Sequence, residues 1–443
     1  MIRTGDNPML TRLKQSATPQ NIFLLIFFLA ITFQYSLPGI LPIEYTVVEL
    51  VVFFACAILV FGRTDIFSQW HRLFFSDSIV RLFLLWALWA SFLWIIVSDW
   101  QYNLNENRWI LLSLFALILM LQIVRADEER VIWIFLGVSV VTALIADLQG
   151  ITGIFTPPFS SLTSKDIFIG ANEAVSQSVA VGFFRHPNAF GGYIFWPFLI
   201  SLGFLHDRRK RWFAVAGILL FGASLYLSYY RTLLLGLGFA VGLYILLWLR
   251  PSPRLLAVSF TGLGIFGVAA SILALHLAPT LSFFDNLWYR IDLWQQAFTY
   301  FQQSPVILLF GSGFAPSVAL ASAQSRSDPH DAFLYMLMHY GIPGLLIFLG
   351  IIWLVLRKGW LAYRDGVLHR QPVLAALWVG WIAWFLTDLL DSRLTTSEWQ
   401  MLFVVVLAIF FGGLAVEKTR SDSAPVPEGV PVQPQSQINR PSK

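Results

Sequence analysis

The amino-acid sequence predicts an all-α polytopic membrane protein, and two observations support this fold class. Of the 443 residues, 57% are hydrophobic and 12% are charged, and the mean hydropathy is +0.70. Apolar runs of about 17–25 residues, the length of a bilayer-spanning helix, recur along nearly the whole chain. A soluble domain could not bury so much apolar surface. We therefore expect the protein to lie in a lipid bilayer and to bind no nucleic acid.

The apolar runs predict about twelve transmembrane helices in a single domain, residues 1–420. The first run is longer than the core of a signal peptide and more spans follow it, so we expect it to be retained. Long outer loops are expected at about 150–187 and 279–329. The Pro-, Ser- and Gln-rich residues 421–443 predict a disordered cytoplasmic tail. The predicted spans are residues 22–39, 45–62, 79–97, 109–124, 131–149, 189–205, 212–229, 232–249, 254–277, 333–356, 372–391 and 399–417.

The distribution of Lys and Arg predicts the orientation of these spans. Short basic connections at 207–211, 250–254 and 357–370 fall on the same side as the N-terminus, which holds 22 of the 29 basic residues. The positive-inside rule then places both termini in the cytoplasm. Arginine dominates on the outer side, and its planar guanidinium suits phosphate oxygens. The seven outer basic residues are Arg108, Lys165, Arg185, Arg231, Arg290, Arg326 and Arg393.

Arg231 interrupts a long apolar stretch, "LSYYRTLLLGLGF" at 227–239. A charge at membrane depth is costly and usually marks a turn, a pathway or a bound partner. We expect Arg231 at a tight outer turn between two helices. It is either a snorkelling side chain that marks the hairpin or a functional contact, and this residue alone does not decide between the two.

The second outer loop contains a pattern of an amphipathic helix, "DNLWYRIDLWQQAFTYF" at 285–301. Aromatic and apolar side chains recur at helical spacing, which predicts a helix lying at the membrane interface with these side chains down. Arg290 is then held near headgroup level, although the helix could also serve only to cover the bundle. The residues of the predicted buried face are Trp288, Ile291, Trp294, Phe298 and Phe301.

His330 begins the stretch that leads into the tenth predicted span. Asp328 is the expected N-cap and Pro329 the first helical residue, so His330 is expected in the first turn. The positive end of the helix dipole disfavours an imidazolium there, and a neutral imidazole is suited to act as a general base. A structural histidine near the cap is the alternative. His339, deeper in the same span, is interpreted as a packed residue.

Two of these segments resemble motifs of the O-antigen ligase family, within the superfamily that also contains the O-antigen polymerases. "RTLLL" (231–235) resembles the family's membrane-embedded Arg-x-x-x-Leu. "HDAFLYMLMHYGIPG" (330–344) resembles its His-[Asn/Ser/Gln]-x9-Gly-x-x-Gly motif. Asp331 departs from that pattern, because the family has Asn, Ser or Gln at this position.

Three weaker likenesses extend this resemblance to about residues 180–415. "RIDLWQQAF" (290–298) and "SPVILLFGSGF" (304–314) resemble the family's periplasmic arginine segment and the Pro and Gly-x-Gly that follow it. "FFRHPNAFGGY" (183–193) resembles a Pro-Asn segment that leads into a helix. The first five spans resemble the family only in their number and hydrophobicity.

The resemblance implies an inverting, metal-independent glycosyltransferase of the GT-C type that needs no cofactor. Its donor is expected to be a glycan on undecaprenyl pyrophosphate at the periplasmic face of the inner membrane, and its acceptor a sugar hydroxyl of the lipid A core. His330 is the expected base, and Arg231 and Arg290 are expected to hold the pyrophosphate, because arginines can stabilise the leaving group without a metal. Further candidates for substrate binding are Arg185, Asn188, Arg326, Asp331 and Arg393.

Three alternatives remain open at this point. A polymerase would use the same lipid-linked donor with a second glycan as acceptor. A transporter of lipid-linked glycans is the non-enzymatic alternative, although transporters tend to place polar groups near the midplane and not at one face. Asp388 and Asp391 could also form an acid and base pair near Arg393.

Overall fold

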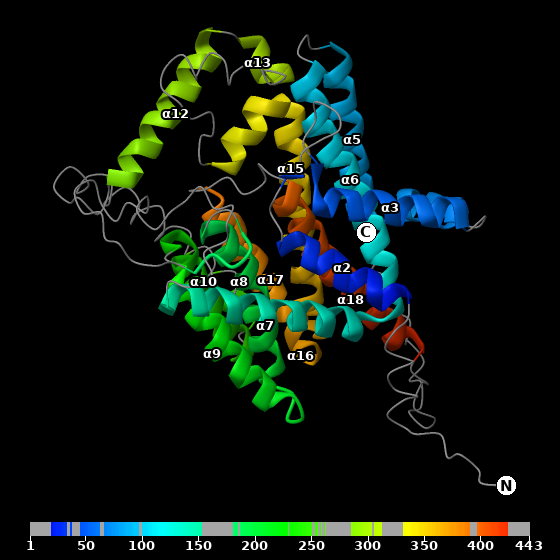
Figure 1. Cartoon of the computed structure of the whole chain (residues 1–443), viewed down its shortest axis with the longest axis vertical. Helices are drawn as coiled ribbons and strands as arrows, with labels where there is room; N and C mark the ends of the chain where they lie inside the picture. Colours follow the sequence, from blue (N-terminus) through cyan, green and yellow to red (C-terminus); the bar gives the residue numbers. More distant parts are fainter. Residues whose placement is uncertain are drawn as a thin grey trace, which may run out of the picture.

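The computed structural model of the protein is almost entirely α-helical (Figure 1). It describes residues 19–32, 36–37, 45–62, 66–96, 100–152, 180–184, 187–228, 230–249, 285–303, 305–311, 331–389 and 397–423, together with 252, 254–255, 258 and 262. The helices are α2 (Pro19–Thr32), α3 (Val47–Gly62), α4 (Ile66–Ser76), α5 (Ser78–Ile96), α6 (Trp100–Ala126), α7 (Glu128–Thr152), α8 (Pro187–Phe204), α9 (Arg211–Leu227), α10 (Arg231–Trp248), α12 (Asp285–Gln303), α13 (Pro305–Phe310), α15 (Ala332–Arg364), α16 (Val367–Arg370), α17 (Pro372–Thr387) and α18 (Ser397–Ser423).

The described helices are those of a multi-pass membrane protein. Four of them contain stretches long and apolar enough to cross a bilayer, at Arg108–Ala126, Glu128–Thr152, Ala332–Arg364 and Trp399–Arg420. The bent pair α4 and α5 would make a fifth, and α2, α3, α9, α10 and α17 are shorter apolar helices. Each predicted span except 254–277 overlaps one of the described helices, while 254–277 lies almost wholly outside the described residues.

The first predicted span, 22–39, is wrong at its C-terminal end. Helix α2 ends at Thr32, and Ser36–Leu37 forms a short strand, β1, that pairs antiparallel with β2, Tyr45–Thr46. Pro38 and Pro42 explain this difference, because a proline disfavours helical geometry in the residue before it. The second helix accordingly begins at Val47.

Helix α4 lies between the predicted spans 45–62 and 79–97. It is amphipathic, since Trp70 and Leu73 are buried while His71, Arg72 and Phe75 are exposed. Its axis makes an angle of 97° with that of α5. An ion pair between Asp77, at the bend, and Arg125, at the end of α6, ties the corner to the bundle.

At the opposite end of the chain, α18 continues to Ser423 and so enters the segment predicted to be a tail. Residues 424–443 lie outside the described part, and a disordered tail from there onward stays a prediction.

Arg108, one of the seven outer basic residues, is a structural residue. Its Nε donates to Oε1 of Glu49 at 3.0 Å, and Glu49, in the first turn of α3, is only 1% exposed. A carboxylate so deeply buried needs such a partner. The pair therefore joins α3 to α6 and is not a candidate for phosphate binding.

Helices α8 and α10, and the part of α15 after Gly341, run antiparallel to α17. The N–H of Ala332 at the start of α15 donates to the carbonyl of Asp388, directly after α17. Close contacts join Gly203 of α8 to Val373 and Gly380 to Leu199, Gly236 of α10 to Thr387, and Gly359 of α15 to Trp378. The first residues of α8, α10 and α15 therefore lie at the same end of the bundle as the last residue of α17. This is the end at which the candidate site is built.

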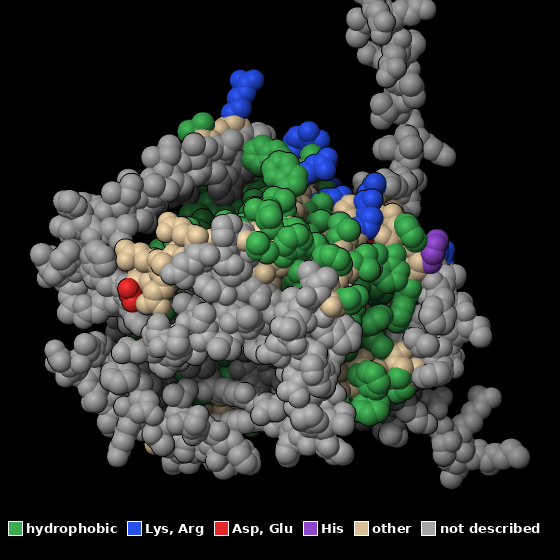
Figure 2. Space-filling model, turned by 90° about the horizontal axis from the view of Figure 1, so that it is seen from above, with side chains coloured by type: hydrophobic (Ala, Val, Ile, Leu, Met, Phe, Trp, Pro, Cys, Tyr) green, Lys and Arg blue, Asp and Glu red, His purple; other side chains and the backbone are tan. Residues whose placement is uncertain are grey.

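Basic residues gather at the other end of these four helices. The connection after α8 and the start of α9 carry four consecutive basic residues, 208–211, and the stretch from α15 to α17 carries Arg364 and Arg370. Figure 1 shows α16 and the connection before α9 at the bottom of the molecule, far from α12 and α13 at the top. Seen from above, hydrophobic side chains cover much of the described surface and Lys and Arg side chains gather along one edge (Figure 2).

Candidate active site

The position of Arg231 follows directly from the turn between α9 and α10. Helix α9 ends at Leu227, Tyr230 is the N-cap of α10, and Arg231 is its first residue. Ser228 helps to close the turn, because its hydroxyl donates to the carbonyl of Leu225 at 2.7 Å. The backbone at Arg231 thus lies at the start of a helix, as expected, while its side chain lies outside the described part.

The start of α10 lies close to the end of α17 and the start of α15. A Cβ on Gly236 would lie 2.6 Å from Cγ2 of Thr387, so no larger residue fits between the two helices without a shift. Arg231 precedes Gly236 by five residues, about 7 Å along the helix axis. The next residue of α17, Asp388, accepts a hydrogen bond at its carbonyl from the N–H of Ala332 at 2.9 Å. The three helix ends therefore meet.

Asp331, and not Asp328, is the N-cap of α15. Its Oδ1 accepts hydrogen bonds from the backbone N–H groups of Phe333 and Leu334, both at 2.8 Å. The prediction that Asp328 caps the helix is therefore wrong, and His330 stands immediately before the cap and not in the first turn. The sequence "DPHD" at 328–331 contains two aspartates three residues apart, and either of them could cap the helix. His330 itself lies outside the described residues.

The capping role gives Asp331 a structural function directly after His330. Asp, Asn and Ser are all strong N-cap residues, because each offers a side-chain oxygen to the first backbone N–H groups of the helix. A direct contact of Asp331 with substrate stays a prediction.

The start of α8 lies beside the α9–α10 turn. A Cβ on Gly191 would lie 2.8 Å from Oγ of Ser228 and 3.2 Å from Cβ of Tyr230. Asn188, in the first turn of α8, is therefore at the same end of the bundle as Arg231. The structure thus gathers the Pro-Asn segment and the Arg-x-x-x-Leu segment, which are some forty residues apart in the sequence.

The segment before α8 is clamped by Gln149, a residue that sequence reasoning missed. The backbone N–H of Gly182 donates to Oε1 of Gln149 at 2.8 Å, and Nε2 of Gln149 donates to the carbonyl of Gly182 at 3.3 Å. The N–H of Ala180 donates to the carbonyl of Leu227 in α9. Arg185 follows three residues after Gly182 but lies outside the described residues. Nothing in the sequence marks Gln149, because its role depends on the backbone of a distant segment.

Two buried carboxylates lie at this end of the bundle. Asp388 is 0% exposed, and Asp147 of α7 is 9% exposed and hydrogen-bonded to Ser224 of α9. The structure brings Asp388 to the start of α15, while Asp391, its partner in the alternative acid and base pair, lies outside the described residues.

Arg290 lies on α12, which confirms the predicted helix. The buried side chains are Leu293, Ala297 and Phe301, whereas Phe298 is 54% exposed. Ala297 and Phe301 pack with Met338 of α15 in a small cluster separate from the main core. Helix α12 therefore packs on α15 through a face that includes a small alanine. That its aromatic side chains point into the membrane interface stays a prediction.

Arg290 is partly buried and belongs to this contact face. It precedes Ala297 by seven residues, two helical turns, just as Asp331 precedes Met338 by seven. Helix α12 and the first turns of α15 both run toward the top of the molecule, where α13 lies (Figure 1). If the two helices are followed back by seven residues from the contact between Ala297 and Met338, Arg290 on α12 and Asp331 at the start of α15 are reached. Arg326 and Arg393 lie outside the described residues.

The glycine-rich turn after α13 packs directly on the break in α15. Gly311 (φ +72°) and Gly341 (φ +66°) both adopt left-handed conformations that favour glycine. A Cβ on Gly341 would lie 2.6 Å from N of Gly311 and from O of Leu309, and a Cβ on Gly311 would overlap the carbonyl of His339. The motif glycine Gly341 is therefore required for the close approach of two backbones.

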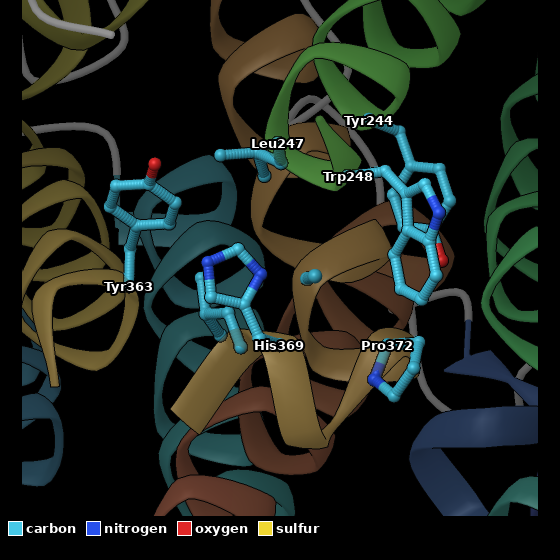
Figure 3. Close-up of a pocket in the computed structure, with 8 residues that line it drawn as sticks. Tyr244, Leu247, Trp248, Tyr363, His369 and Pro372 are labelled. Atoms are coloured by element: carbon cyan, nitrogen blue, oxygen red, sulfur yellow. The ribbon is translucent and has the colours of Figure 1, made fainter. Parts of the chain in front are cut away.

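One pocket in the described structure lies at the opposite, basic end. Its lining includes Tyr244, Trp248, Tyr363 and His369, from α10, α15 and α16 (Figure 3). His206 stacks on Trp248 with ring centroids 3.3 Å apart. Burial, together with the nearby Arg211, lowers the pKa of His206. The pocket is small and is not part of the candidate site.

Within the described residues, no group of three His, Cys, Asp or Glu side chains could hold a metal ion. His330 lies outside that part of the chain, so the metal-independent reaction stays a prediction.

No curated protein matches the chain. The family model described as O-antigen ligase matches residues 215–349, from α9 into the middle of α15. This interval contains Arg231, Arg290, His330 and the two motif glycines Gly341 and Gly344. The match confirms the resemblance seen in the motifs: residues 215–349 of this multi-pass membrane protein are similar to the O-antigen ligase family, which supports a membrane glycosyltransferase of the ligase or polymerase type.

Proposed function

We propose that the protein is an O-antigen ligase that transfers a glycan from undecaprenyl pyrophosphate to a sugar hydroxyl of the lipid A core. It works with inversion at the anomeric carbon and without a metal ion, at the periplasmic face of the inner membrane. The proposed architecture is a single GT-C type domain of about twelve spans over residues 1–420, with both termini in the cytoplasm. The family match over 215–349 is the observation that carries this proposal.

In the proposed reaction, His330 removes the proton from the acceptor hydroxyl as its oxygen attacks the anomeric carbon of the donor sugar. A new glycosidic C–O bond forms, the bond from that carbon to the pyrophosphate breaks, and the carrier lipid leaves with the pyrophosphate. General base catalysis of this kind contributes typically 10²- to 10⁴-fold to the rate. The proton remains on His330 until it is released to water.

Arg231 and Arg290 hold the pyrophosphate and stabilise the negative charge that grows on it. Guanidinium groups suit this role because they stay charged and donate two parallel hydrogen bonds to phosphate oxygens. The starts of α8, α10 and α15 add positive helix-dipole ends at the same place, which favours an anion there. Arg185, Asn188, Arg326, Asp331 and Arg393 are proposed as further contacts to donor or acceptor.

The meeting of three helix ends supports this assignment. Arg231 begins α10, and Asp331 caps α15 directly after His330. At the end of α17, the carbonyl of Asp388 accepts a hydrogen bond from Ala332 of α15, and Thr387 contacts Gly236 of α10. Arg290 lies on the face of α12 that packs on α15. Segments that are about 100 residues apart in the sequence thus come to one end of the bundle.

A transfer assay with the purified protein, a lipid-linked glycan and lipid A core tests the proposal. We expect His330→Ala to lower the rate by about 10²- to 10⁴-fold while leaving the protein folded, and EDTA to have no effect. His71→Ala is the matched control, because His71 is exposed on α4. Near-normal transfer by His330→Ala would remove the base assignment.

A polymerase is the second candidate, because the family match is shared by ligase- and polymerase-type enzymes. The same assay separates the two when lipid-linked repeat units replace the lipid A core as acceptor. Elongation of the lipid-linked glycan without transfer to the core would favour the polymerase. Movement of the lipid-linked glycan between leaflets of a liposome, with transfer to neither acceptor, would favour a transporter.

A further inference from the structure

Helix α15 is divided into two parts at Gly341. This residue has φ 66° and ψ −169°, which is not helical, and Pro343 follows two residues later. A proline has no N–H to donate to the carbonyl four residues before it, so it weakens the helix at the same point. The outer part, Ala332–Tyr340, therefore depends on contacts outside its own helix for its direction.

Trp89 of α5 supplies one of these contacts. Its indole Nε1 donates to the carbonyl of Tyr340, the last residue before the break, at 2.7 Å. The same indole stacks on Phe310, the last residue of α13, with ring centroids 6.3 Å apart and an angle of 19° between the rings. Trp89 thus contacts both elements that meet at the Gly341–Gly311 approach.

A neighbouring tryptophan offers a comparison within the same helix. Trp86 lies one turn earlier in α5 and packs edge-on against the ring of Tyr340, with centroids 5.9 Å apart. It contacts the Tyr340 side chain, whereas Trp89 bonds to the backbone of that residue. Only the second contact acts on the geometry of the break itself.

The outer part of α15 rotates about this break when the backbone angles at Gly341 change. Its nine residues span about 13 Å, so a change of ~10° at Gly341 moves the Asp331 end by roughly 2 Å. Helix α12 packs on this outer part through Ala297 and Phe301, and therefore moves with it. Misplacement of reacting groups by ~1 Å can cost about 100-fold in rate.

We propose that Trp89 is a positioning residue for glycosyl transfer. It holds the break in α15 through the carbonyl of Tyr340 and so sets the direction of the segment that ends next to His330 and carries α12 with Arg290. Its effect on turnover rests on the proposed function, whereas its effect on the direction of the helix does not. Trp89 lies outside the family-matched interval, which makes it a contribution of the N-terminal helices to the site.

The first test compares the kinetics of Trp89→Phe and Trp86→Phe. Phenylalanine keeps an aromatic ring in place of Trp89 but removes the N–H, so we expect kcat to fall by about 10- to 100-fold in Trp89→Phe. In Trp86→Phe we expect a change of less than about threefold, because the bond to Tyr340 remains. Equal kcat values for Trp89→Phe and the parent would overturn the proposal.

The second test measures the direction of the helix without any reaction. In a Cys56→Ser background, spin labels are attached to Asp292→Cys, near the start of α12, and Leu386→Cys on α17, two exposed positions. We expect one distance distribution in the parent and in Trp86→Phe, and one shifted by roughly 2 Å or more, or broadened, in Trp89→Phe.

The two readouts separate the possible failures. If the parent protein transfers no glycan, the proposed function fails, while the distances still decide whether Trp89 holds the break. If Trp89→Phe loses activity and melts at a lower temperature but keeps the parent distances, its role is structural and the positioning proposal is overturned. Shifted distances with unchanged kcat overturn it as well.

Discussion

At the scale of single residues, some side chains of the candidate site fix the position of the backbone, and others are proposed to carry the chemistry. The carboxylate of Asp331 accepts hydrogen bonds from two backbone N–H groups and so caps the helix that begins next to His330. Gln149 holds the segment before Arg185 through the backbone of Gly182. These residues fix where the helix and the segment begin, and the proposed chemistry falls to His330 and the arginines beside them.

A lysine in place of Arg231 tests whether the fork of the guanidinium matters. Arg231→Lys keeps the positive charge but loses the paired donors, so we expect transfer to fall by at least about tenfold. The measurement is kcat and KM for the lipid-linked donor in the transfer assay. A lysine variant with parental activity would instead favour a snorkelling side chain that only marks the hairpin.

At the scale of elements, the break in α15 is built from glycines on two segments and held by α5. Gly341 meets Gly311 and Leu309 backbone to backbone, and Trp89 bonds to the carbonyl beside the break. This arrangement joins α12 and α13 to the bundle. The family motif glycine at 341 thus has a packing reason that the motif alone does not show.

An alanine at Gly341 tests this packing. Its Cβ would come within 2.6 Å of two backbone atoms and would stand at a positive φ, so we expect a loss of about 1–3 kcal/mol in the free energy of unfolding and release of α13 from α15. Thermal unfolding in detergent and proteolysis between α12 and α15 measure the two effects.

Gly238→Ala is the matched control for this variant. Gly238 lies within α10, and a Cβ there would meet nothing within 4 Å. Alanine is the better helix former, so this change should be neutral or slightly stabilising. A similar loss of stability in both variants would show that the backbone contact at Gly341 is not the cause.

At the scale of the whole molecule, α17 is the element that orders the site. Helices α8 and α10 and the part of α15 after Gly341 run antiparallel to it, and the start of α15 is bonded to Asp388. The starts of the three helices therefore lie at the C-terminal end of α17, and their own ends lie near the basic connections. Helix α10 is about 26 Å long from Arg231 to Trp248, close to the ~30 Å of a hydrocarbon core. The candidate site and the basic end are therefore on opposite faces of the membrane if these helices cross it.

Cysteine labelling in intact cells tests the orientation. In a Cys56→Ser background, we expect Lys165→Cys to react with a membrane-impermeant maleimide, because 150–187 is the predicted periplasmic loop. Arg209→Cys, in the basic connection, should react only after the inner membrane is permeabilised. The reverse pattern would place the candidate site on the cytoplasmic face and remove the proposed access to the lipid A core.

The sequence by itself determined the membrane class, most of the described helices, the turn at Arg231 and helix α12. It also showed the resemblance to the O-antigen ligase family over residues 215–349. Hydrophobic runs and short motifs are local properties of the chain. The sequence misplaced the end of α2, which lies before Pro38. It also misplaced the cap of α15, where two aspartates three residues apart compete for the same role. Only the tertiary structure decided that Glu49 pairs with Arg108, that α12 packs on α15 through Ala297, and that Trp89 and Gln149 support the site. These contacts join segments far apart in the chain, and their energy depends on the approach of two backbones or side chains that no local pattern records.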